Sequence, residues 1–332
     1  MKSGKKSSLV ASEIAALWNT YESDSLAICM FKHFLNNVDD RKTRNLIEKA
    51  KQLSESHIED IKKIYDEENL TVPIGFGKDD LDEKAPRIFT DVFYLFYLSD
   101  MAGFGIDGYS LFNRYIARPD IRDFFITCIK DACDLYREVA DLMCEYGVFS
   151  KSPRVEVDKS STFVESDSFV SGLNVNPRPL VVREVTSIFS GLVFDAMWRA
   201  ISIGFGQSCR SKQVKNYFFK GRDIATDHYK KFSEYLMNEH LNISSNSDTF
   251  VTDSTIPAFS DRLMMHHILV LCNFAITVDG FSIAASLRPD LTMMHTKFAA
   301  EIAKYASKGI KLMIKNKWME QPPQIIRHDK LS

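Results

Sequence analysis

The second half of this sequence repeats the first at an offset of 170 to 172 residues, and this repeat constrains the fold more than any other feature. Segment 41–49 (RKTRNLIEK) falls on 212–220 (KQVKNYFFK) at an offset of 171. The Arg-Pro-Asp turn at 118–120 meets its copy at 288–290 at an offset of 170, and an insertion or deletion in a loop would produce this one-residue change. Similarity at so long an offset indicates duplication of a whole domain-sized unit.

Two copies and the residues between them define the expected domains. The first unit spans 8–149 and the second spans 180–323, while 150–179 is rich in Ser, Val, Pro and Asp without a helical period and predicts an extended linker. Fusion of two copies in one chain mimics a homodimer, so we expect the units to pack about a pseudo-two-fold axis. The 14 glycines and 10 prolines of the 332 residues are few, which favours long helices with short connections.

Apolar residues recur at helical spacing in four long segments of each unit. The expected helices of the first unit cover about 14–35, 41–68, a segment that starts near Pro86, and a segment that Arg118-Pro-Asp opens. Residues 36–40 form a short turn, whereas 70–84 carries a proline, two glycines and an acidic run and predicts a long connection. We therefore expect an all-α fold of two tandem ferritin-like four-helix bundles.

Several of these features together resemble a known family. They are the Leu9-x-x-x-Glu13 opening, the Asn45/His57 and Asn216/His228 spacings, and the two Arg-Pro-Asp turns. This set resembles the tandem-repeat, ferritin-like proteins of unknown function from endospore-forming bacteria, which are similar in turn to spore-coat F-type proteins. The resemblance extends from about Leu9 to Pro323. It implies a two-bundle α fold and an association with sporulating cells, and it implies no established activity.

Composition and motifs exclude several classes of function. Lys and Arg number 42 against 44 Asp and Glu, so no bulk charge favours a nucleic-acid partner. The six cysteines form no C-x-x-C pair, as is typical of a reducing compartment. The apolar stretch 263–287 contains Asp279 and lacks clustered Lys or Arg flanks, which favours a core helix over a transmembrane span. We expect a soluble, cytoplasmic or spore-associated chain with protein partners, including self-association.

Acidic and imidazole side chains fall on inward-facing positions near the middle of the predicted helices. Asp24 and His57 lie on the buried stripes of the first two helices, at similar distances from the turn that joins them, and Asp131 borders the stripe of the fourth helix. The second unit offers Asp195, His228 and Glu301 at matching positions. Carboxylates and imidazoles that converge inside a bundle can bind Fe, Mn or Zn, so these six residues are a candidate transition-metal set.

An alternative to a metal site stays open at these positions. A di-iron centre needs Glu-x-x-His on two helices, and this motif occurs nowhere in the chain, since Ser54 and Ala225 stand three residues before the two histidines. A buried Asp–His hydrogen bond that fixes the packing of two helices explains the same residues. Adjacent His266 and His267 cannot easily face one metal ion, because neighbouring helical residues point about 100° apart.

Three functions therefore remain open from the sequence. The repeat architecture without an intact catalytic motif favours a non-enzymatic structural or interaction protein of the sporulating cell. A metal-binding or metalloenzyme bundle is the alternative, and atoms converging within about 2–2.5 Å of one point would favour it over a direct Asp–His bond. A small-ligand binder is the third, because the aromatic third helix can line a pocket. An enclosed cavity beside that helix would favour a ligand, and a filled interior would argue against one.

Overall fold

The computed structural model describes residues 7–171, 177–242 and 250–325, and these fold as an all-α protein without β-strands. The helices of the first half are α1 (Ala11–Asn37), α2 (Arg41–Glu67), α3 (Asp91–Asn113) and α4 (Pro119–Glu145). Those of the second half are α5 (Val182–Ser208), α6 (Lys212–Asn238), α7 (Asp261–Ala285) and α8 (Pro289–Lys315). Two short 3-10 turns, Lys78–Asp80 and Asp167–Val170, lie in the connections.

The helix bounds confirm the repeat and its change of offset. Both ends of α5 and α6 lie 171 residues after those of α1 and α2, and both ends of α8 lie 170 residues after those of α4. The offset changes between α2 and α3, in the long connection, where a loop insertion or deletion alters no helix. Each half therefore contains four helices in the same order.

The ends of the helices are held by side chains that both copies share. The Glu13 carboxylate accepts the backbone N–H of Val10 at 2.8 Å and that of Arg118 at 2.7 Å, which ties the start of α1 to the start of α4. In the second half, Glu184 accepts from Val181 and Leu287 in the same way. These bonds satisfy backbone donors that a helix leaves unpaired at its first turn.

The third helix begins later than its sequence predicts. The proline near its expected start precedes an extended stretch, and α3 begins only at Asp91. The backbone of this stretch pairs instead with the other half of the chain, since Thr90 N–H donates to Phe250 O at 3.0 Å and Thr252 N–H donates to Ile88 O at 2.8 Å. A long-range contact has therefore replaced the first turn of the predicted helix.

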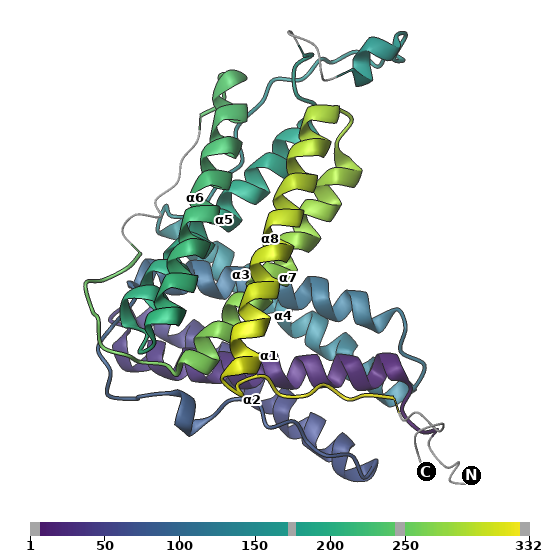
Figure 1. Ribbon diagram of the computed structural model, residues 1–332. Coiled ribbons are helices and arrows are strands. Elements are labelled where there is room, and N and C mark those ends of the chain that lie inside the picture. The colour runs from purple at the N-terminus through teal and green to yellow at the C-terminus, as the bar shows by residue number, and fades with distance from the viewer. Residues whose placement is uncertain (1–6, 172–176, 243–249, 326–332) are drawn as a thin grey trace.

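The two halves cross and share one core (Figure 1). At the crossing, residues contact their own counterparts. Phe104 stacks on Phe274 with ring centroids 3.8 Å apart, and the Tyr97 hydroxyl lies 2.9 Å from His267 Nε2. Each of these pairs is separated by 170 residues, so the repeat-related positions of α3 and α7 meet. This is the arrangement that a pseudo-two-fold axis produces. Two smaller apolar clusters are each built from one half.

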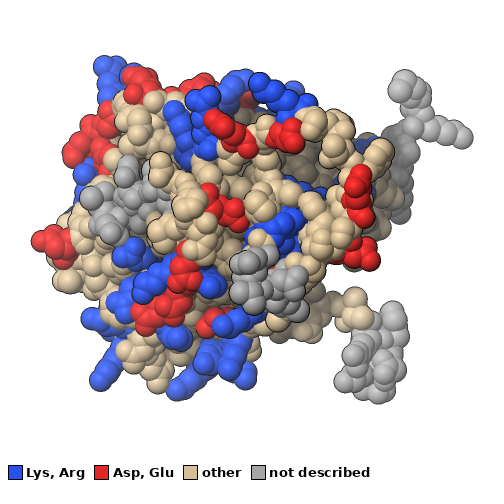
Figure 2. Space-filling view, turned by 90° about the horizontal axis from the view of Figure 1, so that it is seen from above, with Lys and Arg blue, Asp and Glu red and all other residues tan. Residues whose placement is uncertain are grey.

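Within the described ranges, two helices, α5 and α7, are long and apolar enough to cross a membrane by length and composition. The apolar window of α5 is 67% buried and that of α7 is 33% buried inside the protein. Both helices contribute side chains to the shared core, as core helices of the same composition do. On the face seen in Figure 2, basic and acidic side chains are interspersed rather than separated into patches of one sign.

Candidate functional site

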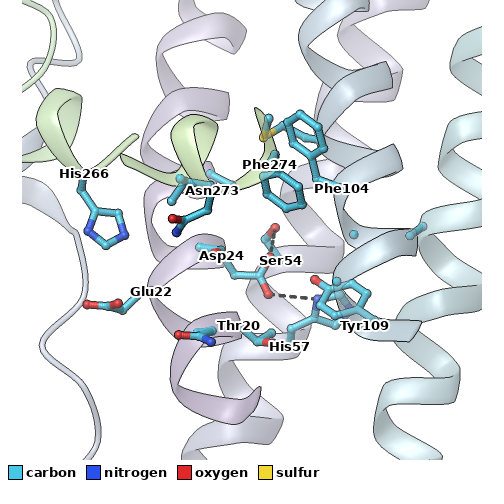
Figure 3. A pocket seen from close by; sticks show the side chains of 18 of the residues that line it. Thr20, Glu22, Asp24, Ser54, His57, Phe104, Tyr109, His266, Asn273 and Phe274 are labelled. Atoms are coloured by element: carbon cyan, nitrogen blue, oxygen red, sulfur yellow. Dashed lines mark hydrogen bonds and ion pairs between the residues drawn. The ribbon is translucent and has the colours of Figure 1, made fainter. Parts of the chain in front are cut away.

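Asp24 and His57 meet inside the first half, as their helical positions predict. Asp24 Oδ2 lies 3.1 Å from His57 Nδ1, and Ser54 Oγ donates to Asp24 Oδ1 at 2.7 Å (Figure 3). The Asp24 and His57 side chains are only 7% and 8% exposed. Burial alone would lower the pKa of His57, but the bond to Asp24, together with the nearby Cys128 thiol, raises it to about 10. The pair is therefore a buried imidazolium–carboxylate ion pair at neutral pH.

The matching residues of the second half are arranged differently. His228 Nε2 lies 3.3 Å from Glu301 Oε2, and within the described ranges no hydrogen bond joins Asp195 to His228. Burial and the charge of Asp279 raise the pKa of Asp195 well above its usual range. Asp279 in turn lies 2.8 Å from His295 Nδ1. The expected convergence of three side chains is thus replaced by two separate acid–imidazole pairs.

The Asp279–His295 pair escapes sequence reasoning because it occurs in one copy only. At the offset of 172, which aligns 107–110 (DGYS) with 279–282 (DGFS), the counterpart of Asp279 is Asp107, but at the offset of 170 the counterpart of His295 is Phe125, so the repeat predicts no such pair. Asp131 lies in the wall of the first-half site, but no hydrogen bond joins it to Asp24 or His57 there.

Metal binding at the six residues named from the sequence stays a prediction. In the part of the chain that the structure describes, no three His, Cys, Asp or Glu side chains are grouped so that they could hold a metal ion. The Asp24–His57 bond occupies one imidazole nitrogen, His57 Nδ1, and one carboxylate oxygen, Asp24 Oδ2.

A cavity of about 490 Å³ lies beside α3, between the first half and helices α7 and α8. This volume falls within the range of small-molecule sites. The apolar part of its wall comes from helices of both halves, and the side chains from α3, α7 and α8 include Met101, Phe104, Phe112, Val270, Phe274, Ile310 and Met313. Its polar part includes Asp24, Ser54, His57 and Tyr109 (Figure 3). The aromatic third helix thus lines a pocket, which is partly open rather than the enclosed cavity that the ligand-binding interpretation of the sequence expects.

The chain that follows α8 closes one side of this cavity. It runs along α1 (Figure 1), and Met319 and Glu320 lie in the cavity wall. The Glu320 carboxylate accepts the backbone N–H of Ile74 at 2.8 Å and of Gly75 at 3.2 Å. Burial, followed by the charge of Glu320, raises the pKa of Glu22 to about 7 at the same end of the cavity. A segment of the second half therefore completes a site of the first.

In the second half, large aromatic side chains occupy positions at which the first half has smaller side chains that leave this space open. Ala27, Cys128 and Leu135 line the cavity, and their counterparts at the repeat offsets are Trp198, Phe298 and Tyr305. These three aromatic side chains are buried. The Phe298 ring stacks on His228 at 3.7 Å, and the Tyr305 ring stacks on Tyr217 at 4.2 Å. The two copies have thus diverged in the volume of the side chains inside them.

Among the comparisons with known proteins, the match to a family model agrees with the duplication. A protein similar in structure is described as a "putative spore coat protein" from Bacillus halodurans C-125; it is 19% identical, and the match covers 45% of this chain and 98% of that chain with a TM-score of 0.43. A search of the curated proteins finds no match. A family model described as a protein of unknown function (DUF3231) matches residues 1–160 and again 168–331. Since these matches cover nearly the whole sequence, the chain belongs to the DUF3231 family and carries two tandem copies of the unit that defines it.

Proposed function

We propose that this chain is a non-enzymatic binding protein whose first half holds one small, mostly apolar molecule. The cavity beside α3 carries this proposal, because it joins an apolar wall to a few polar groups, as ligand sites do. An apolar cavity left empty lowers stability, since its lining atoms lose contacts. The second copy avoids this loss with large aromatic side chains, whereas the first keeps the space.

The polar groups of the cavity support binding rather than covalent chemistry. Burial raises the pKa of Cys128, which keeps the sulfur as a thiol, and a thiol is a poor nucleophile. Asp24 and His57 are bonded to each other, and Ser54 donates to Asp24 rather than to the imidazole, so no activated serine results.

Titration with N-phenyl-1-naphthylamine, a neutral probe that fluoresces in apolar surroundings, tests this function. We expect saturable binding of one probe per chain, with the emission shifted to shorter wavelength, because one apolar cavity accepts one such molecule. Equilibrium dialysis gives the stoichiometry independently. A linear, non-saturating rise in fluorescence would contradict the proposal, since it reports only weak association with the surface.

The finer fold and the cellular setting belong to the same proposal. The connections support ferritin-like order in each half, because 38–40 and 114–118 are short and 68–90 is long. The resemblance seen in the sequence supports a cytoplasmic role in the sporulating cell or the spore. We therefore expect a fluorescent fusion of this protein to accumulate during sporulation. We also expect deletion of its gene to change spore assembly or resistance. Unchanged spores and equal expression in growing cells would contradict this setting.

A further inference from the structure

The solvent-exposed part of the cavity wall forms its mouth, and this mouth is polar but uncharged. Seven of the described wall residues are exposed. Four of them carry an amide or a hydroxyl group, and the other three are apolar: Asn19, Ser23, Asn273 and Thr277, with Leu111, Met319 and Pro322. Every carboxylate among the described wall residues is less exposed than these side chains. A bound molecule therefore meets neutral polar groups where it meets water.

Two helices supply the polar groups of the mouth in pairs. Asn19 and Ser23 stand four residues apart on α1, and Asn273 and Thr277 stand four residues apart on α7, so each pair lies on one face of its helix. In Figure 3 the Asn273 amide is directed from α7 toward α1. Amides and hydroxyls both donate and accept hydrogen bonds, and the hydroxyl groups of a ligand match them in both roles.

The wall changes from polar to apolar along the length of the cavity. On α1 it extends from exposed Asn19 to Phe31, which is only 3% exposed and lies 12 residues, or about 18 Å, further along the helix. On α3 it extends from exposed Leu111 to Leu98, which is completely buried. The two buried ends coincide, because the Phe31 ring lies 6.2 Å from that of Tyr97, the neighbour of Leu98. The site is therefore long, with a polar mouth and an apolar inner end.

The charged groups of the wall do not favour an ionic ligand. No Lys or Arg is present among the described wall residues, and His57 is already paired with Asp24, so an anion would meet carboxylates without a free cation. Glu320 accepts two backbone N–H groups, and Glu22 accepts from the Trp18 indole. These bonds leave few carboxylate oxygens free for a cation, and an ammonium group cannot accept a hydrogen bond from the amides of the mouth.

We propose that the cavity binds an amphiphile with an uncharged head that carries several hydroxyl groups, held between α1 and α7 at the mouth, and one apolar tail directed toward Phe31 and Leu98. This inference rests on the proposed binding function and names its ligand class. The apolar wall alone accepts many molecules, whereas the mouth selects the head. The ligand class is therefore a polyol-headed lipid rather than a fatty acid or a cationic amphiphile.

Calorimetric titration at pH 7 with three octyl compounds, each below its micelle concentration, tests the head. We expect octyl glucoside to bind one per chain, about tenfold more tightly than octyl sulfate or octylammonium, because its hydroxyls both donate to and accept from the mouth. An ion that binds as tightly as the glucoside would overturn the inference. So would failure of octyl glucoside to bind while N-phenyl-1-naphthylamine binds. If neither that probe nor any octyl compound binds, the proposed function itself is wrong.

Comparison of hexyl and octyl glucoside tests the tail. We expect the octyl compound to bind about tenfold more tightly, because it buries two more methylene groups against the apolar wall. Equal affinity of the two glucosides would overturn the inference, since it would mean that the protein binds the sugar alone.

A double variant, Asn19→Ala with Asn273→Ala, tests where the head lies. Both side chains are exposed, so their truncation leaves the core intact. We expect the affinity for octyl glucoside to fall about tenfold, and that for N-phenyl-1-naphthylamine to fall less, because this probe has no polyol head. Asn45→Ala is the matched control, since Asn45 is exposed on α2 outside the cavity wall, and it should bind octyl glucoside as the wild type does. Wild-type affinity in the double variant, or an equal loss for both compounds, would overturn the placement of the head.

Discussion

Replacing Ala27 by tryptophan should reduce binding of N-phenyl-1-naphthylamine by about 100-fold or more. Ala27 lies in the cavity wall, and its counterpart Trp198 is completely buried in the second half. The indole would therefore occupy the space that the probe needs, in a helix that already accepts tryptophan at this position of the repeat. Because it fills a cavity rather than an already packed site, we expect no loss in the free energy of unfolding.

Ala300→Trp is the matched control, because this alanine is exposed on α8 and is absent from the cavity wall. It should bind the probe as the wild type does. The reverse change, Trp198→Ala, should lower the free energy of unfolding by about 3–5 kcal/mol and leave probe affinity in the first half unchanged. Urea denaturation and fluorescence titration measure the two effects separately. Wild-type affinity in Ala27→Trp would place the bound probe elsewhere on the protein.

Helix order and register could be predicted from the sequence because they depend on local patterns that occur twice. The pairing of Asp24 with His57 could be predicted too, since two helices joined by a short turn bring residues at equal distance from that turn to the same height. The start of α3 could not, because residues 88–90 pair with residues 250–252 across the molecule. No local signal reports so distant a partner.

From the sequence, a cavity beside the third helix was one of three open interpretations rather than a prediction. It depends on the difference in volume between residues such as Ala27 and Trp198, and each of them alone is an ordinary core residue. A comparison of the two copies position by position carries the signal, because small residues in one copy face large ones in the other. The arrangement around Asp195 could not be predicted from the repeat, because His295, which pairs with Asp279, has Phe125 as its counterpart in the first copy.

Breaking the ion pair of the first half should be the most destabilising polar substitution in that core. His57→Leu leaves the Asp24 carboxylate buried with only Ser54 as its partner, and we expect a loss of about 3–5 kcal/mol in the free energy of unfolding. The double variant, Asp24→Asn with His57→Leu, should recover most of this loss because no charge remains unpaired. Urea denaturation at pH 7 measures both changes. Equal stability of the single and double variants would mean that Asp24 is not charged.

The two histidines that the repeat makes equivalent should respond to pH with opposite signs. The folded-state pKa of His57 lies above that of an unfolded chain, so its contribution to stability is complete below about pH 6.5 and is lost as the pH rises toward about 10. Burial lowers the pKa of His228 despite Glu301, so stability is lost there as the pH falls below about 6.5. Unfolding free energies of His228→Leu and of the double variant, each compared with wild type from pH 5 to 10, separate the two contributions. The same sign for both would contradict the assignment, because the partners of His57, Asp24 and then Cys128, outweigh the effect of burial on its pKa, whereas Glu301 does not outweigh it at His228.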